Sequence, residues 1–359
     1  MNTRTIRRSS AALGAATVTT AAVLALGATA GRADGHEGER DRGHEKYTVG
    51  LFGDMPYNAL GKAQYPALLA DINAHDVAFS VFDGDMKAGG DGPCSDENLY
   101  TPSLAWFNLL ERPLVWVPGD NDWTDCWGRY GAGTGDADPL ERLDHERLLF
   151  AAGDRSLGRR TLRLARESSE GGAYAQYREN IRWTLGPVVY IGLNVQGSND
   201  NYPYAGVDGE TRSDAEISRM RAEQAARKAA NFHWLDESFA YAKAVGAKGV
   251  MIIWQANPNF NNEDHLPDTR SYDAYPDYVN ALRDHTLAFP GQVVLVHGDS
   301  HNFKMDKPIN APSGGVLANF TRVETFGSRN DHWVSATIDP DAPNLFVFEP
   351  RIVAANANN

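Results

Sequence analysis

The chain has 359 residues and a mass of 39.3 kDa, with 47 acidic side chains against 34 basic ones and a formal net charge of −13. Hydrophobic residues make up 42% and charged residues 23%, which is ordinary for a folded globular protein and excludes a disordered, collagen-like or coiled-coil chain. Because binding to a nucleic-acid backbone relies on Lys and Arg, the acidic balance also argues against strong nucleic-acid binding.

The first 30 residues have the pattern of an export signal. Three arginines and no acidic residue precede an apolar stretch over residues 11–27, and Ala28-Thr29-Ala30 gives a small-x-small cleavage pattern. The Arg7-Arg8 pair favours the twin-arginine route, with the general secretory route as the alternative. No later apolar run is long enough to span a membrane. We therefore expect a secreted or otherwise extracytoplasmic protein without a membrane span.

The remaining chain divides into three parts by composition. Residues 31–46 are almost wholly polar and predict a flexible leader. Residues 47–350 show no internal repeat and no break in composition, so they predict one domain. Residues 351–359 end in an Ala- and Asn-rich run that predicts a disordered tail.

From residue 47 onward, short apolar runs alternate with helix-like stretches. Five of these runs predict buried strands, at residues 47–52, 77–82, 114–117, 249–253 and 293–296. Apolar residues recur at helical spacing across 231–245 and predict a helix that ends at Gly246. A Gly-Pro turn predicts an antiparallel hairpin of 178–185 with 188–193, and further strands are expected at 320–325, 333–338 and 345–349. The pattern is that of an α/β protein with sheets inside and helices outside.

Polar residues follow each of the five buried strands, in segments that we call the strand-end loops. Their sequences are Gly53-Asp54-Met55-Pro56, Asp83-Gly84-Asp85, Gly119-Asp120-Asn121-Asp122, Gln255, and His297-Gly298-Asp299-Ser300-His301. In open α/β sheets, ligands bind beyond the carboxyl ends of the strands, so the five loops are expected to converge on one site. Several carboxylates packed together repel one another unless a cation neutralises them. The residues alone therefore predict a metal centre.

The order of these loops resembles the calcineurin-like metallophosphoesterases, whose five blocks are Asp-x-His, Gly-Asp, Gly-Asn-His-Asp/Glu, a His, and Gly-His-x-His. The resemblance covers roughly residues 47–304, and residues 118–126 and 297–301 look like a secreted bacterial subgroup of that family. It implies a four-layer α/β/β/α sandwich of two mixed sheets with outer helices. It also implies hydrolysis of a small phosphorylated substrate, a phosphoric ester or anhydride, by metal-activated water.

The resemblance assigns roles to individual residues. Asp54, Asp85 and His301 match ligands of the first metal, and Asp85 matches the carboxylate that bridges two metals. Asp120 falls where the family has a ligand Asn. Gln255 and Asp299 occupy two positions where the family has His.

Other positions depart from the family in ways that bear on catalysis. Pro56 replaces the His of the first block, and Asn121 replaces the catalytic His of the third, which removes the usual general acid. His297, at a strand end, and His265, in a loop beyond Gln255, are the candidate replacements. Lys87 is a candidate substrate clamp, a stand-in for one metal, or a solvated side chain.

These ligand types bear on the choice of metal. One or two divalent cations are expected, with manganese, magnesium or calcium favoured over zinc or iron, because the candidate ligands are mostly oxygens. The lost histidines also leave a second hypothesis open, in which the chain keeps the fold but has lost turnover and acts in binding or in a structural role.

Cys94 and Cys126 are the only two cysteines. Export places them in an oxidising compartment, and each lies in a loop just beyond a predicted strand, so we predict that they form a disulfide. We also expect the loop that carries Asp85 to face solvent.

Overall fold

The computed structural model describes residues 45–89, 94–126, 137–203, 212–260 and 273–357, and these residues build two β-sheets. The predicted signal peptide, most of the predicted leader and His265 lie outside the described residues. None of the helices in the described ranges is long and apolar enough to cross a membrane.

The first sheet has the strand order β12-β11-β1-β2-β3. Its strands are β1 (Tyr47–Phe52), β2 (Val77–Phe82), β3 (Leu114–Trp116), β11 (Trp333–Ile338) and β12 (Phe346–Arg351). The first three are parallel, with Leu51 opposite Val81, and β11 pairs antiparallel with both β1 and β12. The carboxyl ends of β1, β2 and β3 therefore lie at one edge.

The second sheet has the strand order β4-β5-β6-β7-β8-β10-β9. Its strands are β4 (Ala165–Arg166), β5 (Ile181–Leu185), β6 (Val188–Gly192), β7 (Gly249–Ile253), β8 (Gln292–His297), β9 (Lys304–Asp306) and β10 (Phe320–Glu324). The central strands β6, β7, β8 and β10 are parallel, and the outer strands pair antiparallel. The carboxyl ends of β6, β7 and β8 also share one edge.

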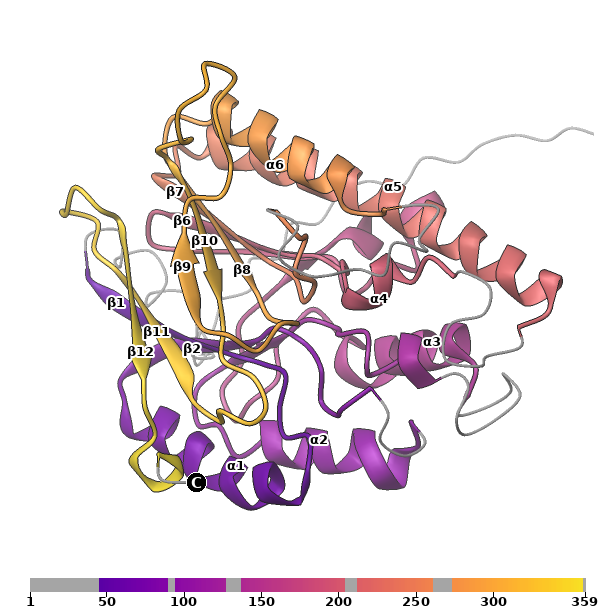
Figure 1. The fold of residues 1–359 in the computed structure, drawn as a ribbon. Helices are drawn as coiled ribbons and strands as arrows, with labels where there is room; N and C mark the ends of the chain where they lie inside the picture. The colour runs from indigo at the N-terminus through magenta and orange to yellow at the C-terminus, as the bar shows by residue number, and fades with distance from the viewer. Residues whose placement is uncertain (1–44, 90–93, 127–136, 204–211, 261–272, 358–359) are drawn as a thin grey trace, which may run out of the picture. The chain divides into compact units, whose positions relative to one another are not determined.

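Helices cover the outer face of each sheet (Figure 1). The longer ones are α1 (Ala59–Ala74), α2 (Thr101–Phe107), α3 (Pro139–Phe150), α5 (Asp214–Ala244) and α6 (Pro276–Ala288). The short ones are a π-helix, η1 (Asp96–Tyr100), one turn labelled α4 (Gly197–Asp200), and the 3-10 turns η2 (Thr124–Cys126), η4 (Glu167–Glu170), η5 (Gly172–Tyr174) and η6 (Ala354–Asn356). Apolar residues of α5 and α6 pack on the second sheet, and those of α1, α2 and α3 pack on the first.

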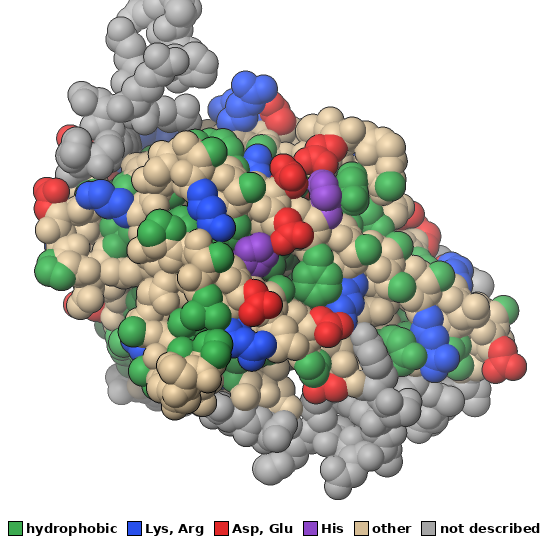
Figure 2. Space-filling model, turned by 90° about the horizontal axis from the view of Figure 1, so that it is seen from above, with side chains coloured by type: hydrophobic (Ala, Val, Ile, Leu, Met, Phe, Trp, Pro, Cys, Tyr) green, Lys and Arg blue, Asp and Glu red, His purple; other side chains and the backbone are tan. Residues whose placement is uncertain are grey.

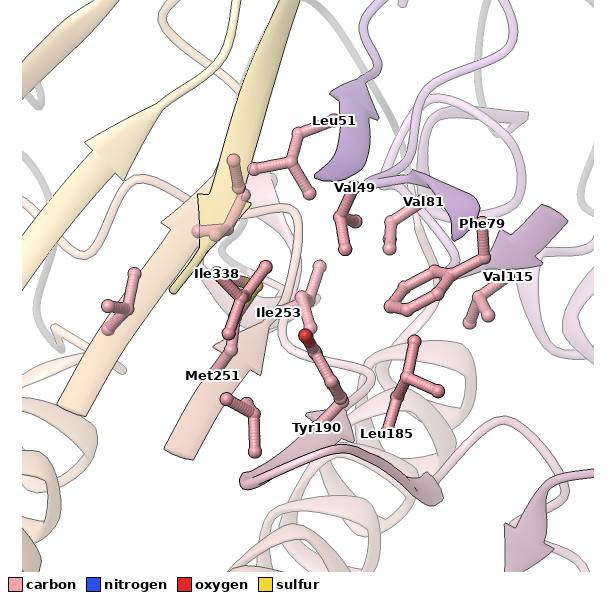
Figure 3. Packing of buried hydrophobic residues seen from close by; sticks show 14 of the residues in the cluster. Val49, Leu51, Phe79, Val81, Val115, Leu185, Tyr190, Met251, Ile253 and Ile338 are labelled. Carbon is pink, nitrogen blue, oxygen red and sulfur yellow. The ribbon is translucent and has the colours of Figure 1, made fainter. Parts of the chain in front are cut away.

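The largest apolar cluster lies between the two sheets (Figure 3). Val49 and Phe79 come from the first sheet, while Met251 and Ile253 come from the second, and all four are fully buried. The Tyr47 hydroxyl also links the sheets, because it donates to the backbone oxygen of Leu185 at 2.7 Å. The layer order is therefore helix, sheet, sheet, helix, as expected, and the α/β/β/α sandwich of two mixed sheets is confirmed.

Two details differ from the sequence expectations. The helix expected at 231–245 begins at Asp214 instead. Its N-terminal half was not predicted, because it is polar on most sides and carries no apolar periodicity. The tail expected to be disordered from residue 351 is instead placed from residue 351 to residue 357. Arg351 belongs to β12, and Asn356 is buried with its side chain donating to the Asp331 oxygen at 2.9 Å.

Candidate active site

The five strand-end loops meet at one site. The backbone N–H of Asp299, after β8, donates to Asp54 Oδ2, after β1, at 2.9 Å. Gln255 Nε2, after β7, lies 3.2 Å from Asp85 Oδ2, after β2. The loop after β3 joins through the Asn121 N–H, which donates to Asp85 Oδ1 at 3.0 Å. The structure thus brings loops from both sheets into direct contact.

Backbone geometry explains the Gly-Asp pairs in these loops. A Cβ on Gly298 would lie 1.9 Å from Asp54 Oδ2, and a Cβ on Gly119 would lie 2.0 Å from Asp85 Oδ1. Only glycine allows such close approach between loops. Four non-glycine residues of the strand-end loops have positive φ, a sparsely populated and strained region: Asp54 (51°), Asp85 (65°), Asp299 (76°) and His301 (65°).

Asp85 is enclosed by hydrogen-bond donors. Besides the Asn121 N–H and Gln255 Nε2, its Oδ2 accepts from the Tyr57 hydroxyl at 2.8 Å and from Asn121 Nδ2 at 2.6 Å. The side chain is buried, so the expectation of a solvent-facing loop is wrong at this residue. Burial, and then the nearby carboxylates of Asp120 and Asp54, raise the pKa of Asp85 well above its usual value.

Tyr57, which the sequence analysis did not single out, lies between two predicted metal ligands. Its hydroxyl oxygen is 2.8 Å from Asp85 Oδ2 and 3.1 Å from Asp54 Oδ1. Burial and the two carboxylates raise the pKa of Tyr57, so the hydroxyl keeps its proton and remains a donor. We call Asp54, Tyr57, Asp85 and His301 the Asp54 cluster.

His301 contributes a positive charge to the Asp54 cluster. Its Nδ1 lies 2.8 Å from the Ser328 carbonyl oxygen, and its Nε2 lies 3.4 Å from Asp54 Oδ1. Burial disfavours the charged ring, but the Asp54 carboxylate and the Ser328 carbonyl prevail and raise the pKa of His301 to about 9. The ring is therefore protonated at neutral pH.

Asp120 is contacted by Ser198, a second residue that the sequence analysis did not single out. Ser198 Oγ is 2.7 Å from Asp120 Oδ2 and 3.0 Å from Asp125 Oδ1. Asp120 Oδ1 is buried and has no hydrogen-bond partner among the described residues. A Cβ on Gly197 would lie 2.7 Å from this oxygen and 2.8 Å from Asp299 Oδ1, so both carboxylate oxygens approach the same side of this glycine and a side chain there would clash with them. We call Asp120, Ser198 and Asp299 the Asp120 cluster.

A left-handed turn places Ser198 at the site. Four consecutive residues have positive φ between 49° and 57°: Ser198, Asn199, Asp200 and Asn201. Such a run is costly for non-glycine residues and needs support from its surroundings. Arg227 supplies that support, since its buried guanidinium donates to both the Asp200 side chain and the Asp200 backbone oxygen. The turn follows β6, whose carboxyl end lies beside that of β7.

Lys87 is 6% exposed, so the alternative of a solvated side chain is wrong. Its ammonium group donates to the Ala88 carbonyl oxygen at 3.1 Å. Burial lowers the pKa of Lys87, while Asp122 and Asp125 act in the opposite direction. Lys87 therefore places a cation close to the acidic residues of the site.

His297 is placed differently from the other candidates. It is fully buried, its Nδ1 lies 2.9 Å from the Gly298 carbonyl oxygen, and its Nε2 has no partner among the described residues. Burial lowers the pKa of His297 to about 3, so the ring is uncharged near neutral pH and does not act as a general acid. His265 lies outside the described residues.

The predicted disulfide between Cys94 and Cys126 is confirmed, with its Cα atoms 5.7 Å apart. It indicates an oxidising compartment. Cys126 Sγ lies 3.2 Å from the backbone oxygen of Asp122, and the Asp122 side chain accepts from the N–H groups of Asp85 at 3.0 Å and Met86 at 2.6 Å. Burial raises the pKa of Asp122 to about 7. Asp122 and the disulfide thus hold the loops that carry Asp85 and Asp120.

The donor chemistry fits a cation in one cluster only. Within the described ranges, no group of three or more His, Cys, Asp or Glu is arranged as a ligand set. In the Asp54 cluster, the Tyr57 hydroxyl lies between the carboxylates, where a cation would have to bind. The Gln255 side-chain oxygen is also not free to bind a metal, because this Oε1 accepts from the Gly197 N–H at 2.6 Å. In the Asp120 cluster, the unpartnered Asp120 oxygen beside Asp299 suits a hard cation.

Comparisons with known proteins give a likeness of fold. No protein-family model matches the sequence, and no curated protein matches it significantly. Among solved structures, the chain is similar to one described as GAP50, "the anchor in the inner membrane complex of Plasmodium", at 12% identity and a TM-score of 0.41. The match covers 86% of this chain and 89% of that chain. At this identity and TM-score, it assigns neither an activity nor a partner.

Proposed function

We propose that this chain is a secreted hydrolase of phosphoric esters or anhydrides that acts at the strand-end loops. The observation that carries the proposal is the Asp120 cluster, in which a buried carboxylate oxygen that has no hydrogen-bond partner among the described residues lies close to a second carboxylate. Asp120 and Asp299 would hold a divalent cation there, with manganese, magnesium or calcium preferred because the donors are oxygens. When bound, such a cation polarises phosphoryl oxygens and activates water.

The chain's own residues supply the remaining functions. Lys87, a buried cation beside the acidic residues, binds a phosphoryl oxygen of the substrate. His301 holds a proton at neutral pH, is partly exposed, and donates that proton to the leaving group in place of the missing catalytic His. Ser198 orients the Asp120 carboxylate through its hydroxyl. His297 has no role in this proposal.

The substrate is proposed to be a small phosphorylated molecule rather than a nucleic acid. The face seen in Figure 2 carries acidic, basic and histidine side chains interspersed with apolar ones, not a continuous basic surface. This mixed surface and the net charge of −13 offer little attraction to a polyanion.

The test is an assay of metal-stripped protein against an aryl phosphomonoester, a phosphodiester and a nucleotide, with manganese, magnesium, calcium or zinc restored at matched free concentration. We expect turnover with manganese, magnesium or calcium, and a loss on the order of 100-fold in Asp120→Asn. Asp341→Asn is the control, because Asp341 is exposed and follows β11 at the edge opposite the strand-end loops. Zinc as the best activator would contradict the proposed ligand set.

A second function, binding or a structural role without turnover, is favoured by one observation. Asp85, the residue matched to the bridging ligand, is already saturated by protein donors. A folded, disulfide-bonded protein that turns over no substrate of the panel with any of the four metals would support this second function.

A further inference from the structure

The carboxylates of the Asp54 cluster are hydrogen bonded by the protein's own donors. An ionised carboxylate offers about four lone-pair positions. Asp85 accepts from four donors, namely the Tyr57 hydroxyl, both nitrogens of Asn121, and Gln255 Nε2. A cation that bound here would have to displace at least one of these donors.

Asp54 is satisfied in the same way. Its Oδ2 accepts from the Asp299 N–H at 2.9 Å. Its Oδ1 lies 3.1 Å from the Tyr57 hydroxyl and 3.4 Å from His301 Nε2. The Tyr57 hydroxyl therefore lies between the two carboxylates, either of which can accept its single proton, and the side chain is buried with its ring edge-on to His301 at a centroid distance of 5.1 Å.

The donor orientations are fixed by further contacts. Gln255 presents nitrogen to Asp85 because its oxygen accepts from the Gly197 N–H at 2.6 Å. Asn121 likewise presents Nδ2 to both Asp85 and the Tyr57 hydroxyl, at 2.6 Å and 3.1 Å. Neither amide offers its oxygen to this cluster.

The Asp120 cluster is the opposite case. Asp120 is 6% exposed, and its Oδ1 has no hydrogen-bond partner among the described residues. The same oxygen and Asp299 Oδ1 both lie within 2.8 Å of the position that a Cβ on Gly197 would take, so the two carboxylates approach each other at this glycine. An unpartnered carboxylate oxygen in such a buried position calls for a positive ligand.

We infer that the Tyr57 hydroxyl occupies the position of one cation, so that the centre takes up a single divalent cation, at the Asp120 cluster, and that removing this hydroxyl opens a second cation site between Asp54 and Asp85. The inference rests on the proposed function for the location of the site, but not for turnover. It departs from the two-cation arrangement that the sequence resemblance implies.

The experiment measures metal stoichiometry, by equilibrium dialysis of EDTA-stripped protein against manganese and elemental analysis of the protein. Wild type is expected to bind one equivalent, and Tyr57→Phe two. Tyr65→Phe is the matched control, because Tyr65 is fully buried but its hydroxyl has no hydrogen-bond partner among the described residues. This control should bind one equivalent, as wild type does.

A second variant keeps the inference testable if Tyr57→Phe does not fold. Asp120→Asn in the wild-type background is expected to lose the single equivalent. Two equivalents or none in wild type, an unchanged single equivalent in Tyr57→Phe, or full binding in Asp120→Asn would each overturn the inference. An inactive protein that binds one manganese and gains a second in Tyr57→Phe would contradict the proposed function alone.

Discussion

His301 keeps a proton in a cluster of carboxylates, and this sets its expected chemistry. With its pKa raised to about 9, the ring is a proton donor below that pH and loses this capacity above it. Turnover of a substrate with a poor leaving group should therefore fall as pH rises through about 9. His301→Gln should reduce that turnover by at least about 100-fold and spare an aryl ester with a good leaving group. Equal losses of turnover on both substrates would contradict the role of His301 as a general acid.

His297 differs from His301 although only three positions separate them. Burial lowers the pKa of His297 to about 3, against 6.5 for an unperturbed ring. Between these values the unfolded chain binds a proton that the folded chain does not. The stability contribution is therefore present above pH 6.5 and is lost as pH falls toward 3.

His297→Asn removes this titration while keeping a donor near the Gly298 carbonyl. We expect the pH dependence of the unfolding free energy between pH 3 and 6.5 to decrease by up to about 1.4 kcal/mol per pH unit. Turnover at neutral pH should stay within a few-fold of wild type. Urea unfolding across this pH range checks the expected change in stability. A large loss of turnover in the variant would indicate that His297 has a catalytic role.

At the scale of elements, the turn that carries Ser198 depends on helix α5. Arg227 and Asp200 are both fully buried and form an ion pair. Removing one partner leaves the other charge unpaired, which costs about 3–5 kcal/mol. Arg227→Gln should lower the unfolding free energy by that order and reduce turnover by displacing Ser198.

Arg219→Gln is the control on the same helix. Arg219 pairs with Asp138 at 2.8 Å, but its side chain is 44% exposed, so its loss should cost at most about 1 kcal/mol. Urea unfolding of the two variants side by side gives the comparison. Similar losses in both would show that the buried pair does not support the turn.

The disulfide joins two segments that carry site residues. Cys94 precedes η1, and Cys126 ends η2, shortly after Asp120. In the chain-entropy model, closing a loop of this length stabilises the fold by on the order of 3–4 kcal/mol. We expect Cys94→Ser with Cys126→Ser to lower the unfolding free energy by that amount. Thiol titration of denatured, unreduced wild type should find no free thiol, and two free thiols would contradict the bridge.

The elements that could be predicted from the sequence are those in which the local residue pattern agrees with the burial seen in the structure. The strands expected at 47–52, 77–82 and 249–253 are mostly apolar runs with nearly every residue buried, and their polar loops follow at once. The N-terminal half of α5 was missed because it lacks apolar periodicity, although Ser213 and Glu216 form a capping box that marks its start.

Two site residues, Tyr57 and Ser198, were not predicted because their contacts depend on how separate segments of the chain lie together in the fold. Tyr57 follows the first loop closely, but its reach to Asp85 depends on how two strands lie side by side. Ser198 follows the predicted strand β6 in a run of Gly, Ser, Asn and Asp. Such a run is typical of a tight turn, and it could have pointed to Ser198. The burial of His297 arises because both faces of β8 are covered, which strand pattern alone does not reveal at a strand end.

At the scale of the whole molecule, the two sheets share the apolar layer between them. Met251 on β7 is fully buried in that layer with residues of both sheets (Figure 3). Met251→Ala leaves a cavity there, and substitutions of this kind cost about 2–5 kcal/mol. Because neither sheet has a separate inner core, we expect both to unfold together in the variant, at a lower denaturant concentration than wild type. Far-ultraviolet circular dichroism and tryptophan fluorescence should give one coincident transition, with Leu148→Ala, an exposed leucine on α3, as the neutral control. Two separated transitions would show that each sheet, with its covering helices, folds on its own and that the site lies between independent units.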